Sequence, residues 1–372
     1  MTATTRSAAK KEGKSDGAPP ASEAHTGSKH KTGEGAGSPK PKRSKKEGKQ
    51  QKSIPETIKG QNGTHKEKTT AGTEGKGDHA SSAVEPHGRE EAESVPSSIL
   101  EKGIIYFFFR GRVNVNRPSN VDQIARTYII LRPVEKDAKL GSGPIGDAGN
   151  SRLCMIPKKV LPQSGRDRWI SFVEKSGASF QKLKEEFLAS SDYETKTAGT
   201  RHTPAATPVA EGVYAITSTG RESHLAYILT LPEKLGEVQR EVGLKEKGSF
   251  IISTKNPQYP GPANARLPKS PDYPEELLKE FRSLRWVPTQ PKHLDFANTQ
   301  FLLVGESSGI EKALEPQKED QEDGKAEPVE EMEKLETEDT ERMKGLSNDD
   351  SSRIFADLQV DAGNYPRLQT TF

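Results

Sequence analysis

The sequence predicts an α+β protein: a single strand-rich mixed domain with a few short helices, flanked by a disordered basic N-terminal tail and a disordered acidic C-terminal tail. Of the 372 residues, 30% are hydrophobic and 30% are charged, whereas a chain that folds throughout is about 45–50% apolar. Of the 22 aromatic residues, 19 lie between Tyr106 and Phe301, which places the folded core there. In that interval short β-rich runs outnumber helical patterns and follow no regular alternation, which disfavours a doubly wound α/β fold.

Composition and charge divide the chain into four segments. The formal net charge is +5 over residues 1–96, +8 over 97–305 and −11 over 306–372. Such segregation indicates a protein that meets a polyanion or masks its own basic surface. The expected segments are a disordered basic low-complexity tail at 1–96, an α+β core domain at 97–305, a disordered acidic linker at 306–348 and a short apolar docking segment at 349–372.

The N-terminal tail has little to bury. Residues 1–96 contain no Phe, Tyr, Trp or Leu, so burial cannot offset the entropy of ordering them. Lys-Lys-Glu-Gly-Lys occurs at 10–14 and again at 45–49, but the repeat has no apolar positions that could stack. It therefore indicates low complexity and not a repeat architecture.

The first half of the core is expected to consist of strands. Residues 103–115 form the first, because the apolar run Ile104–Phe109 has strand length and is far shorter than the roughly 18–20 apolar residues of a membrane helix. Ser119 or Asn120 would cap a short helix at 119–124. Further strands are expected at 128–133, which Pro133 ends, at 153–161 after a Gly-rich loop at 141–150, and at 168–173.

In the second half, Phe180, Leu183 and Phe187 fall at helical spacing and predict a helix. The Thr-, Pro- and Gly-rich stretch 190–211 is either an ordered surface loop or a subdomain break. The remaining elements are, in order, a hairpin of 212–218 and 225–231 around the turn 219–222, a helix at 232–242, a strand at 249–254, a Pro-rich loop at 257–274, a helix at 274–284 that begins at a proline, and a strand at 301–304.

The docking segment differs from the acidic residues before it. Ile354 and Leu358 share a helical face beside Phe355, after a cap within 349–352. We expect these three side chains to dock, either on the core of the same chain or on a partner. The alternative is a frayed end whose apolar residues are incidental.

Cysteine usage and the first residues bear on the compartment. The single cysteine, Cys154, can form no intramolecular disulfide and offers no thiol pair for zinc, which indicates a reducing compartment. Residues 1–14 lack the apolar stretch of a secretory signal, and no run is long enough to span a membrane, so neither is expected. No cofactor is expected.

The sharpest functional signal is a basic cluster within residues 39–46, whose cations are Lys40, Lys42, Arg43, Lys45 and Lys46. Nuclear import receptors and nucleic-acid phosphates both bind accessible clustered cations. We therefore expect a nuclear protein, with the cytoplasm as the alternative compartment. The alternative for the cluster itself is a solvated polybasic linker.

Three enzyme-like patterns lead to no catalytic, cofactor-binding or metal-binding expectation. Residues 141–146 spell GxGxxG but lead into a strand, whereas a dinucleotide site needs a helix N-terminus there. Residues 305–309 spell GxSxG, yet the last histidine, His293, precedes the serine, so the order of a nucleophile elbow cannot be built. Outside the tail only His202, His224 and His293 remain, widely spaced and without a cysteine pair.

Four stretches carry a family resemblance: LPEKLGEVQ at 231–239, FIISTKNP at 250–257, DYPEEL at 272–277 and FLLVG at 301–305. They resemble an uncharacterised family of fungal proteins with bacterial counterparts, whose fungal members are often labelled BTB domain transcription factor. The resemblance covers about residues 97–305. It implies a fungal, nuclear protein, but no reaction and no site residue. The strand-rich pattern itself predicts a fold other than the helix-dominated BTB unit.

Together these observations favour a non-enzymatic nuclear interaction protein, associated with transcription or chromatin, that acts through electrostatics and docking. Its expected partners are a nuclear import receptor and nucleic acid or chromatin proteins, and no membrane. The alternative, suggested by the bacterial counterparts, is a small-molecule-binding or enzymatic core of unknown reaction. A concave pocket with converging polar groups would favour that alternative, and a basic or apolar surface patch would favour the interaction protein.

Neutralising the basic cluster tests the nuclear assignment. Replacing Lys42, Arg43, Lys45 and Lys46 by alanine is expected to abolish nuclear enrichment of the full chain, because an import receptor binds the clustered charge. Fluorescence microscopy of a tagged chain measures the distribution, and neutralising the lysines of the repeat at 10–14 is the matched control. An unchanged distribution contradicts the assignment.

Overall fold

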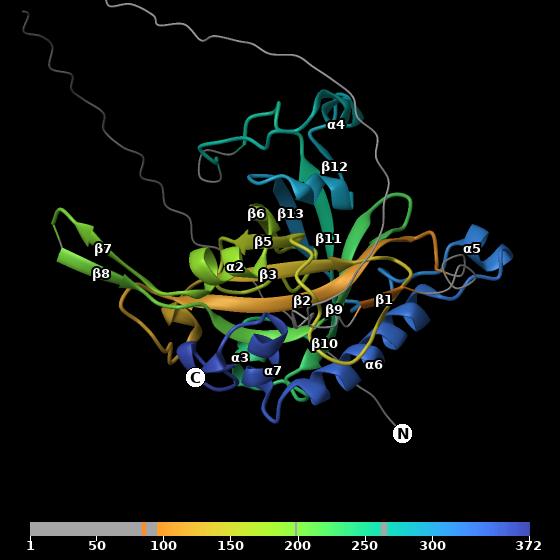
Figure 1. Ribbon diagram of the computed structural model, residues 1–372. Helices are drawn as coiled ribbons and strands as arrows, with labels where there is room; N and C mark the ends of the chain where they lie inside the picture. Colours follow the sequence, from red (N-terminus) through yellow and green to blue (C-terminus); the bar gives the residue numbers. More distant parts are fainter. Residues whose placement is uncertain (1–83, 87–94, 198, 262–265) are drawn as a thin grey trace, which may run out of the picture. The chain divides into compact units, whose positions relative to one another are not determined.

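A large antiparallel sheet that closes on itself dominates the structure, a computed structural model that describes residues 84–86, 95–197, 199–261 and 266–372 (Figure 1). Together with its short helices, the sheet confirms the predicted α+β class. The eight strands of the ring are, in the order in which they pair, β2 (Ile99–Gly111), β3 (Ile124–Val134), β5 (Ser151–Ile156), β6 (Arg168–Ala178), β13 (Gln300–Gly305), β11 (Lys247–Lys255), β10 (Ser223–Leu231) and β9 (Thr207–Ser218), which returns to β2.

The ring consists of two four-stranded meanders. The first runs β2-β3-β5-β6 and the second β9-β10-β11-β13, with β9 beside β2 and β13 beside β6. Strands far apart in the sequence therefore close the sheet. Three further pairings are smaller: β12 (Trp286–Pro288) extends the edge of β11, β1 (Val84–Pro86) pairs with β4 (Ala138–Leu140), and β7 (Ser191–Thr195) pairs with β8 (Gly199–Thr203).

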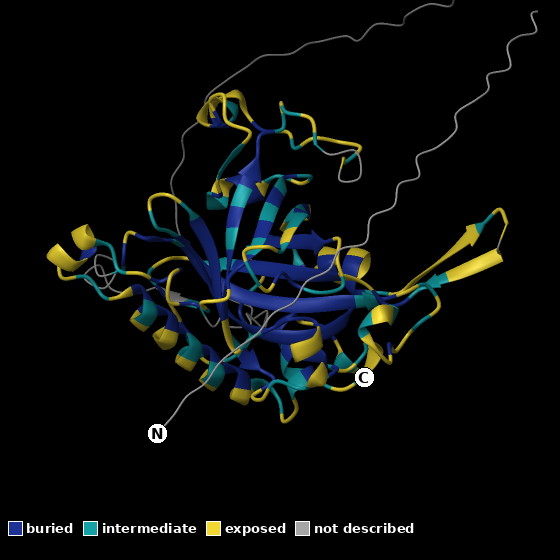
Figure 2. Ribbon diagram, turned by 180° about the vertical axis from the view of Figure 1, so that it is seen from behind, coloured by how far each residue is buried: buried dark blue, intermediate teal, exposed yellow. Residues whose placement is uncertain are grey.

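The apolar run of β2 is buried on both faces of the sheet (Figure 2). Ile105, Phe107 and Phe109 belong to the cluster inside the ring, while the residues that alternate with them, Ile104, Tyr106 and Phe108, belong to a cluster on its outer wall. A continuous apolar run, as opposed to an alternating one, is typical of a strand covered on both sides.

Side chains fill the interior of the ring. The rings of Phe107 and Phe250 pack on opposite sides of Tyr227, with centroids 5.2 and 5.6 Å away. Gly103 leaves space for Tyr214 on the neighbouring strand, since a Cβ at position 103 would lie 2.9 Å from its ring. The interior cavity beside Cys154 measures about 10 Å³, which is about the space of one water molecule.

The helices are short except for one, and they pack against the sheet. Their bounds are η1 (Val121–Gln123), α2 (Phe180–Leu183), the π-turn η2 (Lys184–Leu188), α3 (Glu237–Glu241), α4 (Glu275–Glu280), η4 (Pro291–Asp295), α5 (Lys318–Glu322), α6 (Pro328–Leu346), α7 (Asp350–Asp357) and η5 (Ala362–Asn364). Asn120 caps η1, and Pro274 immediately precedes α4, as predicted.

The acidic segment 306–348 is folded, so the expectation of a disordered linker is wrong there. Its longest helix, α6, runs along the outer wall (Figure 1). The helix buries the apolar side chains of Pro328, Met332, Leu335 and Met343. It turns carboxylates outward, among them Glu330, Glu333 and Glu341. The high charge of the segment concealed this narrow apolar face, whose burial holds the helix in place.

The stretch 190–211 is no subdomain break. It holds the β7–β8 hairpin, which projects from the sheet (Figures 1 and 2), and the first residues of β9. Most of the tail 1–96 lies outside the described residues. Within it, Val84–Pro86 is a strand, which corrects the expectation of disorder for those three residues.

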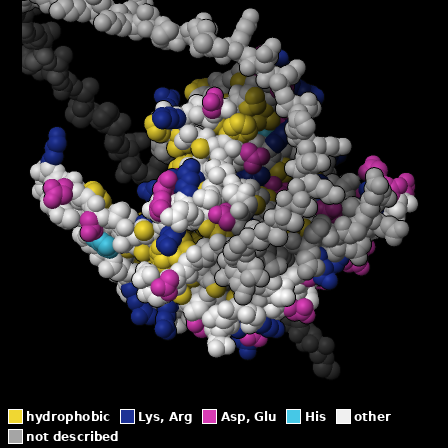
Figure 3. All heavy atoms as spheres, in the orientation of Figure 1, with side chains coloured by type: hydrophobic (Ala, Val, Ile, Leu, Met, Phe, Trp, Pro, Cys, Tyr) yellow, Lys and Arg dark blue, Asp and Glu magenta, His cyan; other side chains and the backbone are white. Residues whose placement is uncertain are grey.

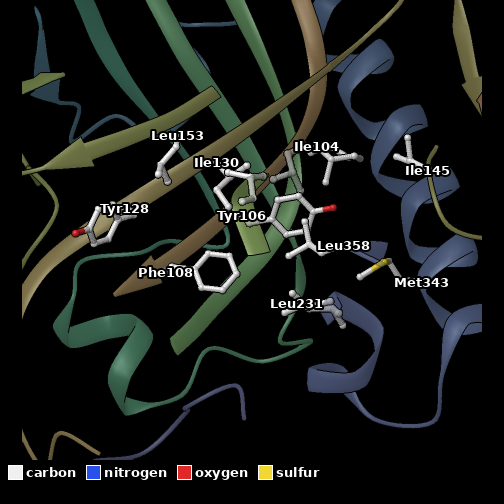
Figure 4. Packing of buried hydrophobic residues seen from close by; sticks show 14 of the residues in the cluster. Ile104, Tyr106, Phe108, Tyr128, Ile130, Ile145, Leu153, Leu231, Met343 and Leu358 are labelled. Carbon is white, nitrogen blue, oxygen red and sulfur yellow. The ribbon is translucent and has the colours of Figure 1, made fainter. Parts of the chain in front are cut away.

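The C-terminal segment docks on the sheet of its own chain. Ile354, Phe355 and Leu358 are fully buried in the outer-wall cluster, and Figure 4 shows Leu358 beside Tyr106 and Ile104 of β2. The phenyl ring of Phe355 stacks on Tyr365 with centroids 5.3 Å apart. This helix and the residues after it therefore complete the core.

A buried polar network centred on Asp357 ties α7 to the sheet and to α6. Its carboxylate accepts hydrogen bonds from the hydroxyl of Tyr106 and from the backbone N–H of Ile145, the latter at 3.0 Å. It also pairs with the guanidinium groups of Arg132, at 3.1 Å, and Arg342. Burial alone would raise the pKa of Asp357, but the two arginines outweigh it and the pKa lies below its ordinary value.

Two further carboxyl groups in this network, those of Glu211 and Asp339, are fully buried. Burial, followed by the charge of Asp339, raises the pKa of Glu211 well above its ordinary value. In the described structure both oxygens of Glu211 and one oxygen of Asp339 lack a hydrogen-bond donor. The raised pKa favours the protonated form of Glu211 in the folded protein.

Removal of the central carboxylate should destabilise the fold strongly. Asp357→Ala is expected to lower the free energy of unfolding by about 3–5 kcal/mol, because it leaves the buried guanidinium of Arg132 without a counter-ion and removes one of the carboxylates paired with Arg342. Glu275→Ala, which breaks an exposed pair with Lys279, is the control and should change it by less than about 0.5 kcal/mol. Denaturant unfolding measures both, and equal losses contradict the role of Asp357.

The raised pKa of Glu211 makes stability depend on pH in a defined direction. Because the folded-state pKa of Glu211 is raised, its contribution is fully present below the unfolded pKa and is lost as pH rises toward the folded pKa. Glu211→Gln cannot ionise, so the variant should gain stability relative to the wild type as pH rises above the unfolded pKa, by up to about 1.4 kcal/mol per pH unit. Parallel pH–stability curves for the two proteins would overturn the assignment.

Candidate functional site

Of the two sets of site residues predicted from the sequence, the structure describes only the docking residues. The import or phosphate-contact residues Lys40, Lys42, Arg43, Lys45 and Lys46 lie outside the described residues. The docking residues, described above, face the sheet and are inaccessible to a partner in this conformation. A functional surface in the described part of the chain must therefore be found elsewhere.

The GxSxG segment contributes its glutamate, and not its serine, to a buried cluster. Glu306 lies 2.8 Å from Nδ1 of His224 and 2.6 Å from the hydroxyl of Ser249. Burial raises the pKa of Glu306, but these two hydrogen bonds more than reverse the shift. The hydroxyl of Ser249 donates to the carboxylate of Glu306 and not to His224, so His224 does not activate Ser249 as a nucleophile.

Charged groups inside the ring pair with groups of the same chain. Arg152 contacts Glu101 at 2.6 Å, and the hydroxyl of Tyr214 donates to the same carboxylate at 2.7 Å. Burial raises the pKa of Cys154 to about 12, so its thiol stays protonated and is a poor nucleophile. With the interior also filled, the described ring offers no chamber for a ligand.

An open hollow of about 540 Å³ lies beside the loop that follows β4. The guanidinium of Arg132 lines it, but its N–H groups already contact Tyr106, Asp357 and the carbonyl of Ile145. Asp147 accepts hydrogen bonds from two backbone N–H groups. The charged groups here are thus engaged within the protein.

A different kind of hollow lies where β11, β12 and β13 meet residues 256–261 and 266–271. Two adjoining hollows, of about 190 and 460 Å³, share Lys255, Pro260, Gly261 and Arg266 in their walls. We call them together the basic cleft. Its cations are Lys255, Arg266, Lys269 and Arg285. Figure 3 shows Lys and Arg side chains among hydrophobic and acidic ones in the upper part of the molecule, where the segment between β11 and α4 lies.

The lining of the basic cleft carries one sign of charge. No Asp or Glu is among the described residues that line the two hollows. None of the four cations forms an ion pair with a carboxylate in the described ranges, whereas nearby Lys292 pairs with Glu280 at 2.6 Å. Unneutralised cations around a hollow create a positive potential that attracts anions.

Lys255 is the innermost cation of the cleft. It is 6% exposed, and its ammonium donates to the carbonyl oxygens of Tyr259, at 2.5 Å, and Asn256, at 3.4 Å. Burial lowers the pKa of Lys255, and the positive charge of Arg285 lowers it further. Because an ammonium has three N–H donors, one remains for an anion, and an anion there would offset both effects.

Hydrogen bonds hold the walls of the cleft in position. The buried amide of Asn256 accepts from the backbone N–H of Gln258 at 3.0 Å and donates to the carbonyl of Leu284 at 3.1 Å. The hydroxyl of Tyr259 donates to the carbonyl of Ser283 at 2.7 Å, which sets its ring 5.9 Å from the guanidinium carbon of Arg285. The segment after β11 is thereby fastened to the segment before β12.

A neutral polar layer lies beneath the cleft. Thr254, next to Lys255, contacts Nδ1 of His293 at 3.1 Å, and Tyr273 contacts the hydroxyl of Thr299 at 2.8 Å. Burial lowers the pKa of His293 to about 4, so this ring carries no charge at neutral pH. Lysine and arginine side chains alone set the charge of the cleft.

Sequence reasoning missed this site. Arg266 and Lys269 lie in the predicted Pro-rich loop, Lys255 follows a predicted strand and Arg285 follows a predicted helix. A pairing of β11 with β12, which joins Lys255 to Trp286, brings them together. A local pattern carries no information about that pairing, so only the excess of positive charge in the core pointed toward such a surface.

Comparisons with known proteins assign the chain to no family. Family models, curated proteins and solved structures gave no match to the chain. Among the described residues, no three His, Cys, Asp or Glu side chains are grouped in a way that could hold a metal ion. No helix in the same part of the chain is both long and apolar enough to cross a membrane.

Proposed function

We propose that the protein is a non-enzymatic nuclear interaction protein, associated with transcription or chromatin, that binds a polyanion through the basic cleft. The observation that carries the proposal is the cleft itself: two adjoining hollows lined by four cations and, among the described residues, by no carboxylate. Phosphate backbones are the polyanions that a nuclear protein meets most.

The filled ring supports binding at the surface. A core that binds a small molecule normally offers a largely enclosed pocket of about 300–1,000 Å³ with a few converging polar groups. Here the cavity beside Cys154 holds about 10 Å³, and Arg152, Glu101 and Tyr214 of the interior bond to one another. Binding in an open cleft on the outer wall fits this interior better.

The charge distribution supports a defined orientation on the polyanion. The exposed face of α6 carries carboxylates, among them Glu330, Glu333 and Glu341. A polyanion is repelled from this face and attracted to the cleft. The acidic segment therefore directs binding, and the basic cluster at 39–46 supplies the expected route into the nucleus.

Neutralising the rim of the cleft tests the proposal. In a full-length chain whose tail cluster is already neutralised, Arg266→Ala with Lys269→Ala should weaken polyanion binding and make log affinity less dependent on log salt. The slope should fall by about 0.9 for each lost phosphate contact with duplex DNA. Fluorescence anisotropy with duplex DNA, single-stranded DNA and labelled heparin, each across a salt series, measures this.

The matched control removes the same charge from another surface. Lys334→Ala with Lys344→Ala neutralises two exposed cations on α6, and the salt slope should stay unchanged. Equal effects of the two double variants would mean that net charge alone drives binding, which would refute a role for the cleft. A chain that binds none of the three probes through the cleft would refute the function.

A further inference from the structure

We infer that the basic cleft binds a single strand of nucleic acid, with phosphates at its cations and an unstacked base against the indole of Trp286. This inference rests on the proposed function, because it names the polyanion that the same cleft takes. Four features of the cleft lead to it: its mixed lining, the free indole N–H, the connection between the two hollows, and the amide in the smaller one.

The larger hollow offers surfaces for both halves of a nucleotide. Its wall of about 460 Å³ combines the cations Lys255, Arg266 and Arg285 with the apolar side chains of Ile170 and Trp286. A simple polyanion such as a sulfated sugar chain needs only the cations. A base additionally gains from stacking on an aromatic ring, which is worth about 1–3 kcal/mol and tolerates any sequence.

Trp286 is presented differently from the other tryptophan. The indole N–H of Trp169 donates to the carbonyl of Val160 at 3.1 Å, and Lys158 lies over its ring. The indole N–H of Trp286 has no hydrogen-bond partner within the described residues, and the half-buried ring lines the hollow. Trp286 therefore keeps both a stacking face and a donor for a ligand.

The indole is recessed, which favours a strand over a duplex. Trp286 lies on β12, is half-buried and lines the larger hollow together with Pro260 and Gly261. Bases within a duplex stay stacked on their neighbours and cannot enter such a hollow. A duplex would reach only the exposed rim cations Arg266 and Lys269. A flexible strand can place one base inside and its phosphates on the rim.

The smaller hollow continues the path of the strand. It shares Lys255 and Arg266 with the larger one and adds Lys269 together with the carboxamide of Asn298. Amide groups offer both a donor and an acceptor, which suits the exposed edges of an unpaired base. Two linked hollows that both combine cations with groups for a base fit successive nucleotides better than one isolated phosphate.

The test uses Trp286 as its own reporter. Trp169→Phe leaves Trp286 as the single tryptophan of the full chain, and the four-cation tail variant removes competing binding by the tail. This protein is titrated with 12-nucleotide oligo(dT) and oligo(rU), a 12-base-pair duplex, thymidine monophosphate and heparin. We expect both single strands to quench Trp286 fluorescence, and to bind more tightly than the other probes at equal salt.

A second pair of variants measures the contribution of stacking. Trp286→Leu should weaken single-strand binding by about 5- to 100-fold, while Trp286→Phe, which keeps an aromatic face, should recover most of the loss. Neither should alter heparin binding. Thermal unfolding of each variant checks the fold, and the quenching of Trp286 in the unsubstituted cleft remains informative even if a variant is unstable.

Each remaining outcome overturns the inference in its own way. Equal binding of strands, duplex and heparin, unaffected by Trp286→Leu, would leave the cleft as a general polyanion site and keep the proposed function. Thymidine monophosphate that binds as tightly as the strands would indicate a small-nucleotide site. Absence of binding by every probe would refute both the inference and the proposed function.

Discussion

One buried carboxylate, that of Asp357, connects every layer of the folded chain. It meets Tyr106 on β2, Arg132 on β3, Arg342 on α6 and the backbone of Ile145. A charged group that is buried away from water is stable only while its charged and hydrogen-bonding partners are in place. The carboxylate of Asp357 therefore constrains the geometry of the fold as well as stabilising it. It allows α6 and α7 a single position on the outer wall, and that position in turn covers the apolar outer face of β2.

The helices cover one side of the ring, and the other side stays accessible to a binding partner. Helices α6 and α7 lie on the outer wall of β2, β3 and β9, while the wall beside β11, β12 and β13 keeps the hollows with their cations. The near-neutral total charge of +2 therefore hides two opposed surfaces. An approaching polyanion experiences these local fields and not the total, since screening confines each field to about 8–10 Å.

Local elements were largely predictable from the sequence, and their assembly was not. Runs of β-branched and aromatic residues located most strands, and the turn 219–222 and the proline before α4 follow from turn and helix-start chemistry. The helix α6 was not predicted from the sequence, because its few buried apolar side chains lie among many charged residues. The basic cleft was not predicted either, because its cations come from segments that are distant in the sequence. Strand pairing brings these segments together, and a local sequence pattern does not encode long-range pairing.

The long sequence separation within the Asp357 network has a consequence for biosynthesis. Tyr106 leaves the ribosome well before its partner, because 251 residues separate it from Asp357. At ordinary rates of translation this interval lasts roughly 10–50 s. During it, the outer face at Ile104 and Tyr106 lacks the helix that later covers it. The nascent chain therefore exposes part of an apolar strand until α7 emerges and the last layer can close.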